Sequence, residues 1–262
     1  MTKIGLLGYS KIKHFVIITT IVSCIGCKQQ KSQLEAIAGR QVVIDSTHVA
    51  VDSIQQWIAP YKKSVDDVLD APLAYSPIAL SKNDGVKNTS MGNFFSDMVL
   101  EETRALFEKQ NKPKVDFVVM NHGGIRAVLP KGTINARNAY EIMPFENFIS
   151  VVELNGTQVR DLVRFLVGSE RPHGVAGISI QFNADRTLRS IDINGEPFDE
   201  SRNYHVATSD YLVTGGAEIG FFPEVEQVFE TEYLLRNAII DHFKAKDTLT
   251  AEVDQRFIQF QN

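Results

Sequence analysis

The sequence predicts an α+β fold in which a mixed β-sheet is flanked by helices. Residues 178–182 and 188–193 alternate between apolar and polar side chains, as half-exposed strands do, and Asn194-Gly195 then signals a turn. Elsewhere strand patterns are followed by helix patterns, so hairpins and strand-helix-strand units are both expected. Because no repeat, low-complexity block or second linker interrupts residues 40–262, we interpret this segment as a single domain.

The first half of this domain contains two expected strands and two expected helices. Residues 40–45 are a β-branched run typical of a short strand, and residues 51–69 predict a helix that breaks near Pro60. Apolar residues at 91, 94, 95, 98 and 99 form one stripe of a helix that ends near Gln110. Residues 115–120 are nearly all apolar, which predicts a strand buried on both faces.

The second half repeats the same alternation. Residues 148–154 predict a strand, and the turn residues Asn155-Gly156 separate it from a helix with apolar residues at 159, 162, 163, 166 and 167. The two alternating strands at 178–182 and 188–193 come next, and residues 233–243 predict the last helix. This order favours an α+β arrangement over a doubly wound parallel sheet.

Composition excludes several classes of function. The chain has 262 residues, with 27 Lys and Arg against 32 Asp and Glu, and therefore a formal net charge of −5. Proteins that bind nucleic acids carry a basic face, so DNA and RNA are not expected partners. The six histidines are isolated from one another, and the sequence has no phosphate-binding loop, dinucleotide fingerprint or zinc-protease motif. We therefore expect no metal or other cofactor in this chain.

The N-terminal segment has the order of charges and apolar residues that a secretion signal requires. Lys3, Lys11 and Lys13 precede an uncharged apolar run at 15–25, which is too short to span a membrane. Ile21-Val-Ser-Cys24 resembles the lipobox of bacterial lipoproteins, and Cys27 offers a second candidate. We interpret residues 1–27 as a lipoprotein signal, with Cys24 or Cys27 lipidated, and residues 28–39 as a polar tether.

One segment combines a buried strand with a polar end. The strand at 115–120 delivers Asn121 to its end, and Gly123 and Gly124 allow backbone N–H groups to approach a ligand closely. Arg126 follows at a distance from which it could hold an anion. From the pattern alone, a tight turn with a surface arginine is an equally good interpretation.

Asn121-His-Gly-Gly-Ile-Arg126 resembles the Asn-x-Gly-Gly-Ile-Arg signature of the C-terminal domain of periplasmic and ecto 5′-nucleotidases and UDP-sugar hydrolases. Further segments resemble motifs of that family in the same order. They are Ser90-Met-Gly-Asn93 with Asp97, Tyr140-Glu-Ile-Met-Pro-Phe145, residues 154–162, Gly174-Val-Ala-Gly-Ile178 and residues 204–222. The likeness covers roughly residues 45–243 and implies the fold of that domain for residues 40–262.

The resemblance also implies residue roles. Asn121 would contact the base, Arg126 would bind the anionic group of the substrate, and Phe145 would stack on one face of the base. Lys87 falls where the family has a second arginine. The second aromatic ring is less defined, because Ala217 and Ile219 replace the family's Asp and Phe. Phe221 or Phe222 could supply that ring, and Glu224 lies near the family's ribose-binding Asp.

In that family the C-terminal domain is not the catalyst. The resemblance implies that this chain holds a nucleotide or nucleotide-sugar while a separate metallophosphatase chain, with its own divalent metals, hydrolyses the phosphate ester. The expected location is the envelope of a Gram-negative bacterium, lipid-anchored and facing the periplasm. Whether the chain itself is an enzyme stays open at this stage.

Three alternatives remain. The chain could capture nucleotides or nucleosides without hydrolysis. It could be a structural lipoprotein whose site has decayed, which Lys87, Ala217 and Ile219 favour. Autonomous hydrolysis has the least support, since no set of metal ligands is visible in the sequence.

Overall fold

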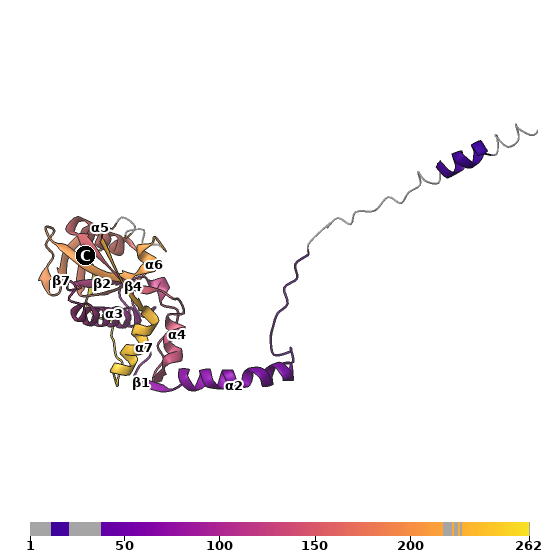
Figure 1. Ribbon diagram of the computed structural model, residues 1–262. Helices are drawn as coiled ribbons and strands as arrows, with labels where there is room; N and C mark the ends of the chain where they lie inside the picture. The colour runs from indigo at the N-terminus through magenta and orange to yellow at the C-terminus, as the bar shows by residue number, and fades with distance from the viewer. Residues whose placement is uncertain (1–11, 21–37, 217–221, 223–224, 226, 262) are drawn as a thin grey trace, which may run out of the picture. The chain divides into compact units, whose positions relative to one another are not determined.

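The computed structural model describes residues 12–20, 38–216, 222, 225 and 227–261 (Figure 1). Internal contacts divide the chain into two compact units, Met1–Asp52 and Ser53–Asn262. In the first unit residues 12–20 are helical, whereas Cys24 and Cys27, the predicted lipidation sites, lie outside the described residues. Within the described part of the chain, no helix has the length and apolar character needed to cross a membrane.

The strand predicted at 40–45 does not form. These residues have no regular secondary structure up to a turn that begins at Asp45, and Val42, Val43 and Ile44 are exposed. Their β-branched side chains favour an extended backbone, but a strand also requires a neighbouring strand to bond with. The prediction was therefore wrong at this position.

From Asp52 onward the elements are, in chain order, α2 (Asp52–Leu69), β1 (Pro72–Ser76), α3 (Ser90–Lys109), β2 (Phe117–Met120), the 3-10 turn η1 (His122–Gly124), β3 (Gly132–Asn135), α4 (Ala136–Ile142), β4 (Phe148–Asn155), α5 (Gly156–Gly168), β5 (Gly174–Ala176), β6 (Ile178–Asn183), β7 (Leu188–Ile193), β8 (Glu196–Pro197), β9 (Asn203–Ser209), α6 (Asp210–Val213), β10 (Gln227–Leu234), α7 (Leu235–Ala245) and β11 (Phe257–Phe260).

The strands of the described residues form three sheets. The largest has the order β10-β4-β9-β2-β5, the second the order β11-β6-β7-β8, and β1 pairs with β3. Within the largest sheet β2 is parallel to β9 and antiparallel to β5. The sheet is therefore mixed, and helices cover it, so the predicted α+β class is confirmed.

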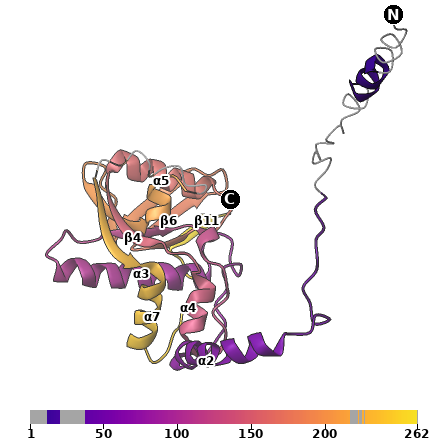
Figure 2. The same ribbon diagram turned by 45° about the vertical axis from the view of Figure 1, so that its right-hand side comes forward.

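Two hydrophobic cores lie on opposite faces of the five-stranded sheet. Val118 and Met120 of β2 pack in the core that contains residues of α3 and α7, while Phe117 and Val119 pack in the core that contains α5. In Figures 1 and 2, α3 and α5 accordingly lie on different sides of the sheet. Every residue of β2 is buried, as its nearly continuous apolar run predicted for a strand covered on both faces.

Helix boundaries follow local hydrogen bonds and pairing. Thr89 caps α3 by accepting a hydrogen bond from the N–H of Gly92 at 3.0 Å, and Asn155 and Gln158 form a reciprocal capping box at the start of α5. Helix α2 continues through Pro60, so the predicted break is wrong. The last helix begins at Leu235, two residues later than predicted, because the preceding residues belong to β10.

Helix α5 offers a matched pair of glycines for testing this packing. A Cβ on Gly156 would lie 2.1 Å from the carbonyl oxygen of Glu200, whereas a Cβ on Gly168 would have no atom within 4 Å. We expect Gly156→Ala to lower the free energy of unfolding by about 1–3 kcal/mol through overpacking. Gly168→Ala should leave it unchanged or raise it by up to about 1 kcal/mol. Urea unfolding of both variants would show this, and equal stabilities would contradict the described packing.

Candidate functional site

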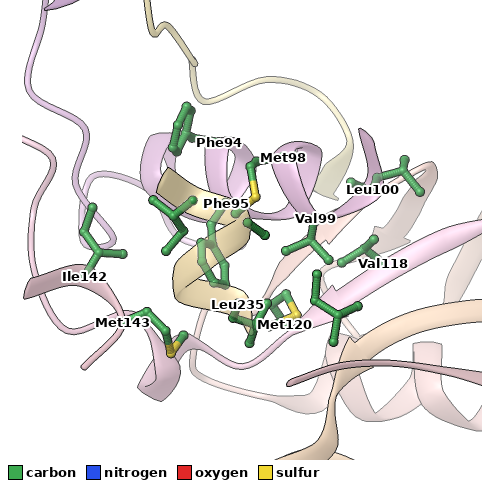
Figure 3. Packing of buried hydrophobic residues seen from close by; sticks show 14 of the residues in the cluster. Phe94, Phe95, Met98, Val99, Leu100, Val118, Met120, Ile142, Met143 and Leu235 are labelled. Atoms are coloured by element: carbon green, nitrogen blue, oxygen red, sulfur yellow. The ribbon is translucent and has the colours of Figure 1, made fainter. Parts of the chain in front are cut away.

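A pocket of about 300 Å³ lies where β2 ends. Met120, Met143 and Leu235 form its apolar lining and also belong to the core beneath α3 and α7, as Figure 3 shows. The remaining residues that line it come from three separate stretches of the chain: Asn121, Gly123, Gly124, Arg126, Phe145, Asn147, Ser209 and Tyr211. The structure thus brings together five of the residues predicted from the sequence.

Asn121 occupies the position that the buried strand imposes. It follows β2 directly, is 8% exposed, and its carbonyl accepts a hydrogen bond from the N–H of Gly124 at 3.0 Å. Its side-chain amide makes no capping hydrogen bond with η1. This amide can both donate to and accept from a bound group.

The two glycines after Asn121 differ in their roles. A Cβ on Gly124 would lie 2.8 Å from Oδ1 of Asn121, so any side chain there would displace the amide. A Cβ on Gly123 would lie 3.5 Å from Nδ2 of Asn121, which is an ordinary contact. Gly124 is thus required for the placement of the Asn121 amide, and Gly123 is not.

Arg126 lines the pocket, and Lys82, which does not line it, lies near enough to Arg126 for their positive charges to interact. The exposed Arg126 guanidinium donates to the carbonyl of Gly123 at 3.2 Å and lies 5.8 Å from the centre of the Phe145 ring. Nζ of Lys82 donates to the carbonyl of Ile125 at 2.6 Å. Burial, followed by the nearby charges of Arg126 and Arg171, lowers the pKa of Lys82. Lys82 was not predicted, because nothing in its local sequence distinguishes it.

Phe145 and Tyr211 are the aromatic side chains that line the pocket, and they are 44% and 46% exposed. Tyr211 is the second residue of α6, which follows β9 directly, and the hypothetical Cβ of Gly216 would lie 2.3 Å from its ring. Tyr211 lies within residues 204–222, which resemble a family motif, but the resemblance alone indicated no role for it. Its aromatic type in that motif was the available signal.

Arg236 holds the loop that carries Phe145. Its Nη1 donates to the carbonyl of Phe145 at 3.3 Å, and its Nη2 lies 3.5 Å from Oε1 of Glu146. The guanidinium also stacks on Tyr140, with Cζ 4.4 Å from the ring centre, and the residue is 8% exposed. A buried cation thus fixes the backbone of an exposed aromatic residue, a function that the sequence did not indicate.

Two predicted residues lie elsewhere. Nζ of Lys87 donates to the carbonyls of Val167 and Ser169 at 2.9 and 2.6 Å, so its charge satisfies the C-terminal end of α5 and does not line the pocket. Phe222 is fully buried in the core that contains α5, and its ring cannot serve the pocket. Phe221 and Glu224 lie outside the described residues.

His173 connects the start of the site to the end of α5. It is 2% exposed; its Nδ1 accepts a hydrogen bond from the N–H of His122 at 3.4 Å, and its Nε2 lies 3.0 Å from Oγ of Ser169. Because Nδ1 accepts a hydrogen bond, the neutral ring carries its proton on Nε2, and Nε2–H donates to Oγ of Ser169. Burial, with the charges of neighbouring His122, Arg171 and Lys87, lowers the pKa of His173 to about 4.

Within the described residues, no three His, Cys, Asp or Glu side chains are placed to hold a metal ion. The groups that line the pocket include an amide, two aromatic rings and a guanidinium, which can hold a ligand by hydrogen bonds, stacking and charge. Such an arrangement suits a flat, hydrogen-bonding ring that carries a negative charge at some distance.

Comparison with known proteins agrees with this geometry. A family model described as "5′-nucleotidase, C-terminal domain" matches residues 72–224, more than half of the chain. The 5′-nucleotidase of Vibrio cholerae is 26% identical over 191 residues, which are 71% of this chain and 33% of that protein. Protein UshA of Escherichia coli is 30% identical over 114 residues, which are 42% of this chain and 21% of that protein.

Solved structures share the fold. The 5′-nucleotidase precursor of Thermus thermophilus superposes with a TM-score of 0.66 at 20% identity, covering 80% of this chain and 43% of that one. The NAD nucleotidase of Haemophilus influenzae superposes with a TM-score of 0.62 at 19% identity, covering 81% and 42%. This chain thus spans less than half the length of these relatives.

The buried His173 makes a prediction about stability and pH. Its pKa is about 4 in the folded protein against 6.5 in the unfolded chain, so the unfolded chain takes up the proton first as the pH falls. The stabilising effect is complete above pH 6.5 and is lost as the pH falls towards about 4. We expect His173 to contribute a loss of roughly 3 kcal/mol across this window.

Urea unfolding at several pH values would measure this loss. His173→Gln keeps a hydrogen-bonding side chain but cannot titrate there, so its free energy of unfolding should depend less steeply on pH than that of the natural protein. Identical pH profiles for the two proteins would contradict the buried, neutral state of His173.

Proposed function

Since this chain belongs to the family of 5′-nucleotidase C-terminal domains, we propose that it binds and presents the substrate, a nucleotide or nucleotide-sugar, for hydrolysis. The observation that carries the proposal is the pocket at the end of β2. There an amide, two exposed aromatic rings and a guanidinium surround a volume of about 300 Å³. These groups match the base and the phosphate of a nucleotide.

The base would lie between Phe145 and Tyr211. Stacking on aromatic side chains contributes about 1–3 kcal/mol of binding free energy per base and does not discriminate between bases. Tyr211 takes the role that the sequence analysis assigned to Phe221 or Phe222. The amide of Asn121 would pair with the edge of the base, where it can donate and accept at once.

Arg126 would hold the phosphate, with Lys82 beside it in place of Lys87. A guanidinium forms paired hydrogen bonds with phosphate oxygens, and a lysine adds charge without that geometry. Stacking at about 1–3 kcal/mol for the base, an Arg–phosphate hydrogen bond of about 1.5–3 kcal/mol and an amide contact of about 1 kcal/mol together give a dissociation constant between about 1 mM and 10 μM. That affinity allows release after each turnover.

We further propose that a separately encoded metallophosphatase supplies the divalent metals and the metal-activated water. The matched part of the Vibrio cholerae 5′-nucleotidase is 33% of that protein, so most of the relative lies outside the likeness. A lipid anchor at Cys24 or Cys27 would keep the pair together in a Gram-negative envelope on the periplasmic side. The support for the anchor is the order of lysines, apolar run and cysteines in residues 1–27.

A nucleotide-binding lipoprotein without any hydrolytic partner is the second candidate. It requires the same pocket, so binding experiments do not separate it from the first candidate, whereas stimulation of a phosphatase does. A structural protein with a decayed site would show neither property. Nucleotide binding and stimulation of a phosphatase, measured separately, therefore distinguish the three functions.

The binding site is tested by titrating the protein with AMP, UDP-glucose and ribose 5-phosphate in a calorimeter. Phe145→Ala should weaken AMP binding about tenfold, because one stacking ring is lost, and should leave ribose 5-phosphate binding unchanged. Asn121→Ala should weaken AMP binding about fivefold through the lost amide contacts.

The glycines supply the matched control for this titration. Gly124→Ala should weaken AMP binding as Asn121→Ala does, since its Cβ displaces the Asn121 amide, whereas Gly123→Ala should change the affinity less than about twofold. If all four variants bind AMP like the natural protein, the nucleotide lies elsewhere and the assigned pocket is wrong.

The split enzyme is tested by mixing the chain with secreted metallophosphatases of the same organism and measuring phosphate released from AMP. The cognate phosphatase should gain about tenfold or more in rate at low AMP concentration, because binding energy away from the phosphate orients the substrate. Asn121→Ala should reduce this gain. If AMP binds but no phosphatase associates or is stimulated, the non-hydrolytic function is correct instead.

A further inference from the structure

Helix α2 carries an apolar stripe that the described part of the protein does not cover. Ile54, Trp57, Tyr61, Val65 and Val68 are 56%, 70%, 65%, 53% and 70% exposed, and no residue of the helix is buried. Large apolar side chains gathered along one helix are unusual on a protein surface and mark an interaction site. We therefore expect another helix or surface to bind this stripe.

The way α2 is attached turns this stripe away from its own domain. Arg137 at the start of α4 contacts Asp66 and Asp70, with Nη2 to Oδ1 of Asp66 at 2.7 Å and Nε to Oδ1 of Asp70 at 2.6 Å. At 3.6 residues per turn, both aspartates lie across the helix from Tyr61. In Figures 1 and 2, α2 runs outward from the end of the domain near β1 and α4.

The spacing of the stripe identifies its partner. Ile54, Ile58, Tyr61, Val65 and Val68 are separated by four, three, four and three residues, which is the heptad repeat of a coiled coil. Ile58 and Val65 then occupy the a positions, where β-branched side chains favour two parallel strands. A pattern of this kind matches a second helix with the same pattern.

We propose that α2 pairs in parallel with α2 of a second copy of this chain, making the protein a dimer. In that register Trp57, at a g position, faces Lys62 of the partner subunit at an e position. An ammonium over an indole ring is a favourable contact, and the symmetry of the pair forms it twice. The other charged side chains of the helix, Asp52, Lys63, Asp66 and Asp67, lie outside the contact.

A lipid surface fits the helix less well. Helices that lie on membranes carry lysines and arginines on the polar face, whereas α2 has three aspartates against two lysines. Anionic headgroups would repel this face. The proposal concerns a surface remote from the pocket, so it stands or falls independently of nucleotide binding.

The oligomeric state tests the proposal. Sedimentation equilibrium of the full chain with Cys24→Ser and Cys27→Ser should show a monomer–dimer equilibrium at concentrations up to about 0.1 mM, the range of weak specific association. Val65→Lys places a charge in the contact and should raise the dissociation constant at least tenfold. Gln56→Lys, on the opposite side of the same helix, should leave it unchanged.

Two further measurements fix the geometry. Tyr61→Cys at the d position should form a disulfide-linked dimer in the same background, and Gln56→Cys should not. Trp57 is the sole tryptophan of the chain, so its emission should shift to shorter wavelength as the natural protein dimerises.

The proposal is overturned by a monomer throughout this range. It is overturned equally by a dimer that Val65→Lys leaves intact, which would place the association elsewhere, for instance in residues 12–20. A monomer whose Trp57 emission shifts only on adding phosphatidylglycerol vesicles would assign the stripe to a lipid surface instead. Val65→Lys and the natural protein should have the same far-ultraviolet circular dichroism spectrum, which shows that the variant is folded.

Discussion

Strand β2 is buried on both faces, and the position of the site follows from that burial. Its residues alternate between the core beneath α3 and the core that contains α5, so the strand cannot shift without disturbing both. Backbone and side-chain hydrogen bonds to β9 add to this, including one from Thr208 Oγ1 to the carbonyl of Val119 at 2.9 Å. Asn121 follows the strand directly, so its backbone is held at a fixed place.

The pocket is an extension of the core on one side and an exposed surface on the other. Met120, Met143 and Leu235 belong to the core and also line the pocket, so packing that stabilises the fold also shapes the binding surface. On the exposed side, the side chains of Arg126 and Phe145 are less tightly packed and can change conformation more easily. Arg236 connects the core to this exposed side, because it is buried and donates a hydrogen bond to the carbonyl of Phe145. Pre-organisation of this kind reduces the entropy lost on binding.

Regions that depend on local signals were predicted well. Strand β4 and helix α5 follow hydrophobic periodicity and an Asn–Gln capping box, and both appear within a residue or two of the expected bounds. Predictions failed where a distant segment decides the outcome. Residues 40–44 found no neighbouring strand, Lys87 satisfies carbonyls at the end of α5, and Phe222 fills a core. Neither secondary-structure propensity nor an ungapped comparison of motifs can predict contacts between residues that are distant in the sequence.

By itself the sequence determined the family, the α+β class and the contiguous part of the site, because Asn121, Gly123, Gly124 and Arg126 lie within six residues at the end of a strand whose burial its composition reveals. Only the tertiary structure decided which distant side chains join them. Lys82 and Arg236 come from distant parts of the chain, and their local sequence carries no sign of the pocket. Tyr211 lies in a family-like motif, but only the structure places it beside the pocket. The same holds for α2: its periodicity predicted a helix, but only the structure shows that its apolar stripe is exposed while Asp66 and Asp70 contact Arg137.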